Sequence, residues 1–433
     1  MLYIEIFTDT LMKYKILRNK QALSPVISGI ILIAVTVAVA VAATTWLGSM
    51  SISFMATEEI HVLNCQWAED GSYADLTVKN FGTNKVTLHS AQVSNDEASS
   101  VTFVSGNGIV NAGEEVIMRV YYDYSTITKY QFSVVTSKGN KFFCISTSPQ
   151  DSSITFKMEW GTETVNDVFT QVNLHNNYVS PVIFCSPSYV SGDPRTVRIT
   201  DVSSQSFKVR IQNPSGTSCP NTEISYLVVE EGVWINPIKL EAVKYSTNTV
   251  GRKNNWIYDT RDYQQTYSGN IVVLHQVMSY DDPNWITTYV SRRSSSSSPP
   301  NSGDSSFRIA LNGAEATSSH GNETVSYIIF EQEFGEVSGI KYDCKTTSDF
   351  VRGYGNSPPY NTAFSQSFDS APSVVLGTQL EMDGGDGGWC VSHIITLGQA
   401  GLMIDEDQVS DSERSHTTET CGFLAFEASG SYP

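Results

Sequence analysis

One uncharged apolar segment near the N-terminus constrains this chain more than any other feature. No Asp, Glu, Lys or Arg occurs from Val26 to Leu47, a run of 22 residues. A helix of that length spans the roughly 30 Å hydrocarbon core of a bilayer. Lys13, Lys15, Arg18 and Lys20 precede it with no acid among them, and such basic residues hold their side of a span in the cytoplasm. The sequence therefore predicts a single-pass membrane protein with a cytoplasmic N-terminus and an extracellular ectodomain.

The junction KQA/LSPVI (20–27) resembles the class III signal of archaeal type IV pilins. In that family a prepilin-type peptidase cuts on the cytoplasmic side of the apolar stretch and leaves the stretch on the mature protein. The resemblance implies a cut between Ala22 and Leu23, a basic leader over 1–22, a pilin-like transmembrane helix over 23–57, and other pilin subunits in a surface filament as partners. Met1 and Met12 both remain candidate starts, since a leader from Met12 has the length typical of the family.

Two simpler interpretations of the same segment stay open. An uncleaved signal anchor has the same basic start and apolar span. A secretory signal cut after Ala40 or Ala42 also fits, because small residues flank those positions.

Composition predicts a mainly β ectodomain. The 433 residues include 21 Tyr and 19 Phe, and aromatic and β-branched residues favour strands. The net charge of −18, from 45 acids against 27 bases, excludes non-specific binding to nucleic acid.

Residues 58–150 are expected to form a small β-sandwich. Alternating apolar segments are separated by turn residues, and Ser137-Lys138-Gly139-Asn140 is typical of a hairpin. The pattern resembles the immunoglobulin-like domains that follow archaeal pilin stems.

Four strand-like blocks recur three times, in the same order, between residue 152 and the C-terminus. The first block is SPVIF (180–184), NIVVL (270–274) and PSVVL (372–376), and the last is TEISYLVVEEG (222–232), NETVSYIIFE (322–331) and TETCGFLAFE (418–427). We expect three β-sandwich repeats over 152–250, 251–340 and 341–433. A Ser-rich insert (292–306) interrupts the second, and its composition predicts a mobile surface loop.

These repeats resemble H-type lectins, through Phe364, Phe368 and Pro372 ahead of an apolar strand and an aromatic closing strand. The resemblance implies lectin-like sandwiches; in that family, sugars like N-acetylgalactosamine bind at the edge of a trimer. Because three copies are joined in one chain, we expect an intrachain pseudo-trimer with closing strands related by approximate three-fold symmetry.

Candidate ligand sites lie in the turn-rich segments. Trp256, Trp285 and Trp389 are candidates for stacking on sugar rings, with core packing as the alternative. Calcium is the candidate cofactor of the third repeat, because Ca²⁺ binds six to eight oxygens and its Gly-rich loops carry carboxylates at Asp383, Asp386, Asp405, Asp407 and Asp411. The spacing is not that of an EF-hand, and a solvated acidic loop is the alternative.

Other candidates concern structure and modification. Disulfides are expected outside the cell, with Cys65–Cys144, Cys185–Cys219 and Cys390–Cys421 as pairs. Asn322 is a glycosylation sequon. Glu223, Glu323 and Glu419 open the closing strands and are expected to accept backbone or Arg hydrogen bonds, with Arg198, Arg210 and Arg308 as candidate donors; a repeated ligand contact is the alternative.

The chain is not expected to be an enzyme. His416, Glu419 and Asp411 suggest acid/base chemistry, but no nucleophile with a characteristic motif accompanies them. The sequence favours an archaeal pilin-like adhesin that binds glycans or neighbouring surfaces. A membrane-anchored structural protein without a ligand is the alternative, and a stem-anchored hydrolase is the third hypothesis.

Overall fold

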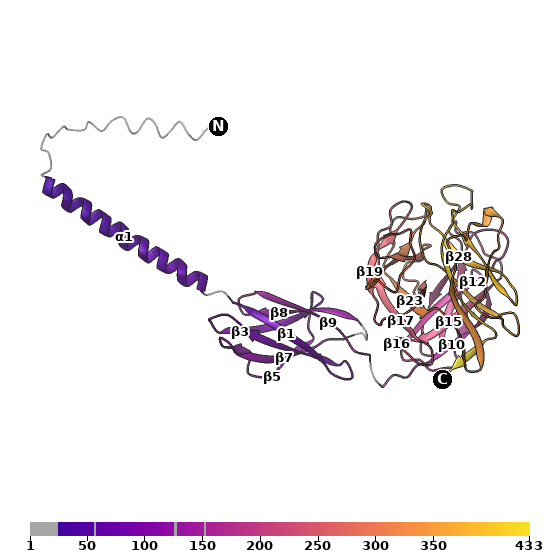
Figure 1. Cartoon of the computed structure of the whole chain (residues 1–433), viewed down its shortest axis with the longest axis horizontal. Coiled ribbons are helices and arrows are strands. Elements are labelled where there is room, and N and C mark those ends of the chain that lie inside the picture. The colour runs from indigo at the N-terminus through magenta and orange to yellow at the C-terminus, as the bar shows by residue number, and fades with distance from the viewer. Residues whose placement is uncertain (1–24, 56–57, 125–127, 151–152) are drawn as a thin grey trace, which may run out of the picture. The chain divides into compact units, whose positions relative to one another are not determined.

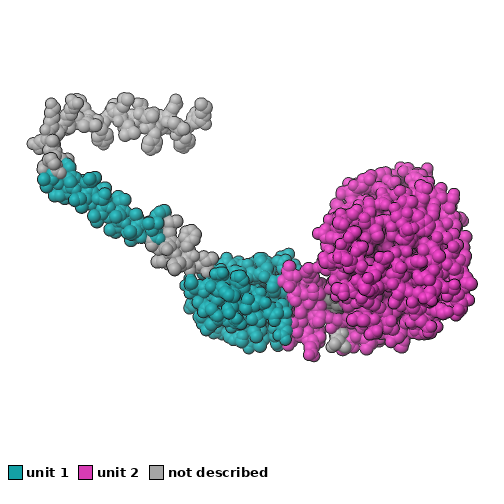
Figure 2. Space-filling model, in the orientation of Figure 1, with its two compact units in different colours: residues 1–66, 75–121, 131–144 teal, residues 67–74, 122–130, 145–433 magenta. Residues whose placement is uncertain are grey.

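The computed structural model describes residues 25–55, 58–124, 128–150 and 153–433. Strands make up 49% of it and helix 6%, which confirms the mainly β prediction. The chain divides into two compact units (Figure 2). The predicted leader and the Ala22–Leu23 junction lie outside the described residues.

The N-terminal helix α1 (Pro25–Met55) is long and apolar enough to cross a membrane over Val26–Leu47 (Figure 1). Pro25 opens it, at a position where a missing N–H leaves no bond unmade. The hydroxyls of Thr36, Thr44 and Thr45 donate to the carbonyls four residues earlier, at 2.6–2.8 Å. The three threonine hydroxyls are therefore already bonded to the helix backbone, as a polar group inside a membrane requires.

The small sandwich follows the helix and has two antiparallel sheets, ordered β1-β2-β7-β5 and β4-β3-β8-β9, with β6 beside β3. Its strands are β1 (Ile60–Trp67), β2 (Tyr73–Asn80), β3 (Val86–Val93), β4 (Asp96–Glu97), β5 (Ser100–Ser105), β6 (Ile109–Val110), β7 (Glu115–Tyr121), β8 (Lys129–Thr136) and β9 (Lys141–Thr147). Alternate side chains such as Leu76, Met118 and Phe132 are buried, as strands with one face on a core require. Gly139 turns β8 into β9 at a positive φ of 84°, so the predicted hairpin is confirmed.

The rest of the chain forms three further sandwiches, each with a four-stranded inner sheet and an outer sheet of three or four strands. The first contains β10 (Met158–Val165), β11 (Thr170–Asn173), β12 (Pro181–Pro187), β13 (Thr196–Thr200), β14 (Ser206–Gln212) and β15 (Thr222–Glu230). The second contains β16 (Gly232–Trp234), β17 (Leu240–Thr247), β18 (Val250–Gly251), β19 (Asp259–Asp262), β20 (Ile271–Val277), β21 (Thr287–Arg292), β22 (Ser306–Asn312) and β23 (Glu323–Glu331). The third contains β24 (Glu333–Val337), β25 (Ile340–Thr346), η1 (Tyr354–Asn356), β26 (Tyr360–Ala363), β27 (Val374–Gln379), β28 (Trp389–Ile395), β29 (Gln399–Asp405) and β30 (Cys421–Phe426).

The three inner sheets have the same strand order. The predicted closing strands β15, β23 and β30 each lie in the middle of a sheet, between the apolar first block (β12, β20, β27) and a lead-in strand (β10, β17, β25). The strand pairing thus reproduces in space the repeat that the sequence shows.

In each sandwich, the fourth inner strand is the short strand that follows the closing strand of the preceding sandwich in the ring. β16 follows β15 but pairs with β17, and β24 follows β23 but pairs with β25. The last strand, β31 (Gly430–Tyr432), returns to pair with β10, so the C-terminus lies beside the first sandwich (Figure 1). The three sandwiches are therefore joined in a closed ring by short exchanged strands.

The ring surrounds a shared apolar core. β12, β20 and β27 contact one another, and each also contacts a closing strand of another sandwich: β12 contacts β23, β20 contacts β30, and β27 contacts β15. Phe184, Leu274 and Leu376 occupy equivalent positions and belong to one core cluster. Val273 and Val375 alternate with them and face the cores of their own sandwiches. The apolar runs 182–184, 271–274 and 374–376 within the first blocks are buried on both faces, and the predicted three-fold packing is confirmed.

Two details differ from the sequence prediction. β17 pairs with β23, so the second sandwich begins before the predicted boundary at 250/251, because its lead-in strand precedes the recognisable apolar block. The Ser-rich insert connects β21 to β22 and has defined contacts: Arg292 pairs with Asp304 at 2.7 Å, and the amide of Met382 donates to Ser296. A local ion pair and a backbone bond thus hold a segment whose composition suggested mobility.

Candidate functional site

A buried glutamate opens the closing strand of the second sandwich and anchors the turn that follows β20. Glu323 accepts hydrogen bonds from the backbone amides of Asp281 and Asp282, each at 3.2 Å, and from the Ser279 hydroxyl. Arg198, on β13 of the first sandwich, donates to the same carboxylate at 2.7 Å. The expected structural role of this glutamate is confirmed, and its cationic partner comes from the neighbouring sandwich.

The third sandwich repeats this arrangement with a histidine. Glu419 accepts from the amides of Asp383 and Gly384 at 2.9 Å. His416 bridges Glu419 and Glu406, with both ring nitrogens 2.9 Å from a carboxylate oxygen. Burial alone would lower the pKa of His416, but the two carboxylates outweigh it and raise the pKa to about 9. Gly384 is required here, because a Cβ at this position would lie 2.1 Å from the imidazole.

The first sandwich differs from the other two. The strand register places Thr222, not Glu223, at the position of Glu323 and Glu419. Thr222 is buried and accepts from Arg195 at 3.2 Å, whereas Glu223 is exposed. The prediction that Glu223 is the third equivalent carboxylate was therefore wrong, because a shift of one residue turns a strand side chain to the opposite face.

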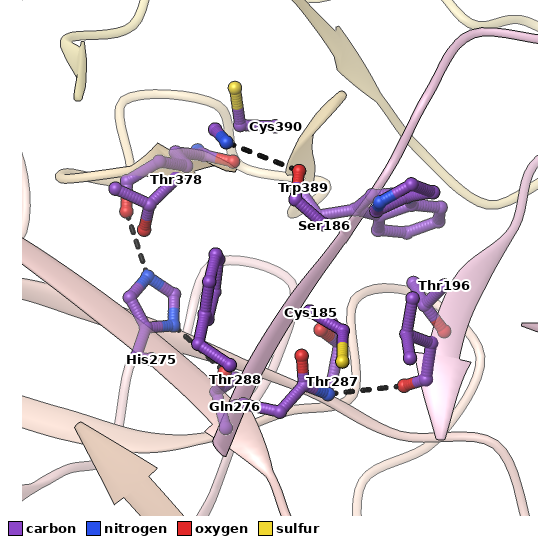
Figure 3. Close-up of a pocket in the computed structure, with 15 residues that line it drawn as sticks. Cys185, Ser186, Thr196, His275, Gln276, Thr287, Thr288, Thr378, Trp389 and Cys390 are labelled. Carbon is purple, nitrogen blue, oxygen red and sulfur yellow. Dashed lines mark hydrogen bonds between the residues drawn. The ribbon is translucent and has the colours of Figure 1, made fainter. Parts of the chain in front are cut away.

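The three sandwiches meet around a small polar cavity of about 40 Å³ (Figure 3). His275 contacts Thr288 at 2.8 Å and the carbonyl of Gln379 at 2.9 Å, and Gln276 donates to the carbonyl of Val197 at 3.1 Å. Burial lowers the pKa of His275 to about 4, so its imidazole is neutral. Ligand pockets usually enclose about 300 Å³ or more. Residues of all three sandwiches line this cavity, and it has room only for water-sized molecules.

Two of the three candidate sugar-binding tryptophans are buried where the sandwiches meet. Trp285 donates its indole N–H to Thr196 at 2.8 Å, and Trp389 donates to the carbonyl of Arg195 at 2.9 Å. Their rings lie 5.4 Å apart, and each residue is only 6% exposed. Both therefore pack and bond against the first sandwich and present no face to a ligand. Trp256 is half-buried, 5.3 Å from the ring of Tyr289.

The five candidate calcium ligands do not converge on one point. Buried Asp405 pairs with Arg414 at 2.7 Å. Buried Asp407 accepts from the amides of Val409 and Glu315. Exposed Asp411 accepts from the amide of Glu413 at 3.1 Å.

The other two calcium candidates belong to separate carboxylate groups. Asp383 lies with Asp349 and Glu381, and Asp386 lies with Glu406 and Glu413. The five candidates therefore do not share one site, because turn and ion-pair contacts occupy three of them. Asp349 and Glu381 were not predicted from the sequence. Neither was the buried Glu–His pair, which the repeated Ser-His-x-x-Glu before β23 and β30 would have indicated.

The six cysteines of the predicted disulfides and the glycosylation sequon all lie among the described residues. No disulfide bond joins cysteines of the described residues. The Cys390 and Cys421 thiols are hydrogen-bonded to each other within the third sandwich, and burial, together with Cys65, raises the pKa of Cys144 to about 12. Cys185 and Cys219 are both buried in the first sandwich. Asn322 is exposed immediately before β23.

A half-exposed aromatic cluster marks the boundary between the first and second sandwiches. The rings of Phe169 and Tyr280 lie 5.1 Å apart, edge to face. The guanidinium of Arg210 lies 5.4 Å from the first ring and 5.8 Å from the second, and Arg198 lies 4.8 Å from Tyr280. Such a surface offers both an aromatic face and hydrogen-bond donors.

Comparison with known proteins adds no family. No family model matches the chain, and no curated protein matches it.

Proposed function

We propose that this chain is an archaeal pilin-like surface protein, an adhesin whose ring of three sandwiches binds glycans or neighbouring surfaces outside the cell. The observation that carries the proposal is the closed ring itself. Exchanged strands and a shared core hold three β-sandwiches together in one chain. Residues of two sandwiches therefore lie side by side at each boundary without self-association of the protein.

The aromatic cluster of Phe169, Arg210 and Tyr280 is the best glycan contact on this ring. It combines residues of two sandwiches at the kind of edge where the resemblance to H-type lectins implies sugar binding. Aromatic faces stack on the apolar faces of sugar rings, and a guanidinium donates to hydroxyl oxygens.

The helix supports a membrane-attached or filament-bound protein. The resemblance at residues 20–27 implies cleavage between Ala22 and Leu23 by a prepilin-type peptidase, which would retain α1 on the mature chain. N-terminal sequencing of the protein from cells should give Leu23 as the first residue. A first residue after Ala40 or Ala42 would show secretion without the helix and contradict the stem.

Binding is tested with the ectodomain, residues 58–433, on a glycan array and on intact cells. Tyr280→Ala should reduce binding at least tenfold, because it removes one ring of the cluster. Phe143→Ala is the matched control, since Phe143 is an aromatic of the small sandwich with 55% exposure. Equal loss in both variants would contradict the site. Absence of binding in the unaltered ectodomain would favour the alternative, a structural surface protein without a ligand.

A further inference from the structure

Three carboxylates from separate segments meet on the third sandwich. Asp386 lies in the turn between β27 and β28, Glu406 directly follows β29, and Glu413 lies in the loop before β30. One oxygen atom from each lies within 4.8 Å of the other two. Glu406 is buried, Asp386 is half-buried and Glu413 is exposed, so the group opens to solvent on one side.

One buried oxygen in this group has no hydrogen-bond partner. Glu406 is only 3% exposed, and its Oε2 contacts His416 at 2.9 Å. Its Oε1 is buried without a partner in the part of the chain that the structure describes. A buried carboxylate oxygen without a partner costs free energy, and a bound ion or water is one way to satisfy it.

Two basic side chains contact members of this group. His416 holds Oε2 of Glu406, and Lys253 contacts both Glu315 and Asp386, the latter at 3.2 Å. Burial, followed by the charges of Glu413 and Asp386, raises the pKa of Glu406 to about 6. The group therefore concentrates negative charge that these side chains only partly balance.

We propose that Asp386, Glu406 and Glu413 bind one divalent cation, and that Ca²⁺ fits best. The ligands are all carboxylate oxygens, which suit hard cations. Ca²⁺ accepts six to eight oxygens in a flexible arrangement, whereas Mg²⁺ demands a near-ideal octahedron, so three carboxylates completed by water suit Ca²⁺ better. The open side leaves room for the waters that complete the coordination.

The other carboxylate group serves as an internal comparison. In the group of Asp349, Glu381 and Asp383, the buried member Glu381 accepts from the amide of Thr420 at 2.7 Å. None of its described oxygens is buried without a partner. It is an acidic cluster of the same size without the feature that points to an ion.

The test is a calorimetric titration of CaCl₂ into the full-length protein in detergent, after removal of divalent ions with EGTA. We expect one site with a Kd on the order of 0.1–1 mM, the range of extracellular calcium modules. Glu413→Gln and Asp386→Asn should each weaken binding at least tenfold. Asp349→Asn, in the comparison group, should leave the Kd unchanged.

Folding is checked separately by thermal unfolding in EGTA. The Tm of Glu413→Gln should equal that of the unaltered protein there, because Glu413 is exposed. In CaCl₂ the unaltered protein should gain several degrees in Tm and the Glu413→Gln variant should not. The proposal is overturned by the absence of binding up to about 10 mM CaCl₂, by an unchanged Kd in Glu413→Gln and Asp386→Asn, or by loss of the site in Asp349→Asn.

Discussion

The Nη2 atom of Arg198 lies 2.7 Å from Oε1 of Glu323, and both side chains are fully buried between the first and second sandwiches. Arg198 also donates to the carbonyls of Asn284 and Asp282. Removal of one partner leaves an uncompensated buried charge, which typically costs about 3–5 kcal/mol. Arg198→Met should therefore lower the free energy of unfolding by that amount, measured by urea denaturation with tryptophan fluorescence.

Two controls separate the buried pair from a general effect of losing charge. Lys208→Met breaks the exposed pair with Asp201 and should cost less than about 1 kcal/mol. The double variant Arg198→Met with Glu323→Leu should recover part of the loss, because apolar replacements of both partners leave no buried charge. If the single variant Arg198→Met is as stable as the unaltered protein, the predicted contribution of the buried Arg198–Glu323 pair is contradicted.

The exchanged C-terminal strand should stabilise the whole ring. β31 pairs with β10, the ring of Tyr432 lies 5.4 Å from that of Phe156, and the carbonyl of Tyr432 accepts from the side chain of Asn176 at 2.9 Å. Deletion of residues 430–433 removes these strand bonds and exposes apolar surface, and should cost roughly 2–4 kcal/mol. Thermal unfolding measures the loss as a lower Tm. Deletion of Pro433 alone, which is exposed and lies beyond β31, should change nothing.

The sequence predicted the repeats because a strand buried on both faces must be apolar at every position. The runs 182–184, 271–274 and 374–376 have this property, and they became part of β12, β20 and β27 around the shared core. Side chains outside those runs were harder to place. Trp285 and Trp389 lie in turn-rich segments, which are usually exposed, and only the packing of three sandwiches buries them.

Ring closure and the proposed cation site were beyond sequence patterns for a related reason. β16 and β31 have three residues each, too few to show an alternation. Asp386, Glu406 and Glu413 are separated in sequence and approach only because β28 and β29 pair in an antiparallel hairpin. Local spacing instead suggested Asp405 and Asp407, which turned out to be occupied by Arg414 and by backbone amides.

Glu241 should make the ring more stable in mild acid. It is fully buried on β17, accepts from the amide of Gln264 at 2.8 Å, and has a second oxygen without a partner in the described chain. Burial raises its pKa from 4.5 to about 7. The folded protein therefore binds more protons than the unfolded chain between these two values, and the free energy of unfolding should fall as the pH rises from 4.5 to 7.

Glu241→Gln removes this titration while it keeps an acceptor oxygen. At pH 8 the variant should be more stable than the unaltered protein, by up to about 3 kcal/mol, and at pH 4.5 the two should be nearly equal. The measurement is the Tm of both proteins from pH 4.5 to pH 8. Glu336→Gln, at an exposed position of β24, is the matched control and should leave Tm unchanged. A stability difference that is constant with pH would contradict the prediction.

Cys65 and Cys144 should form a disulfide when the protein is exported. They lie on β1 and β9, edge strands of the two opposed sheets of the small sandwich, and near enough for Cys65 to affect the pKa of Cys144. With that pKa raised to about 12, little thiolate is available for spontaneous exchange, so oxidation should depend on the exporting pathway.

Peptide mapping without reduction should show the bond in exported protein and two thiols in protein from a reducing cytoplasm. The bond should add about 2–4 kcal/mol, and the Cys65→Ser variant should lose that gain. Alkylation of both cysteines in exported protein, without prior reduction, would contradict the pairing.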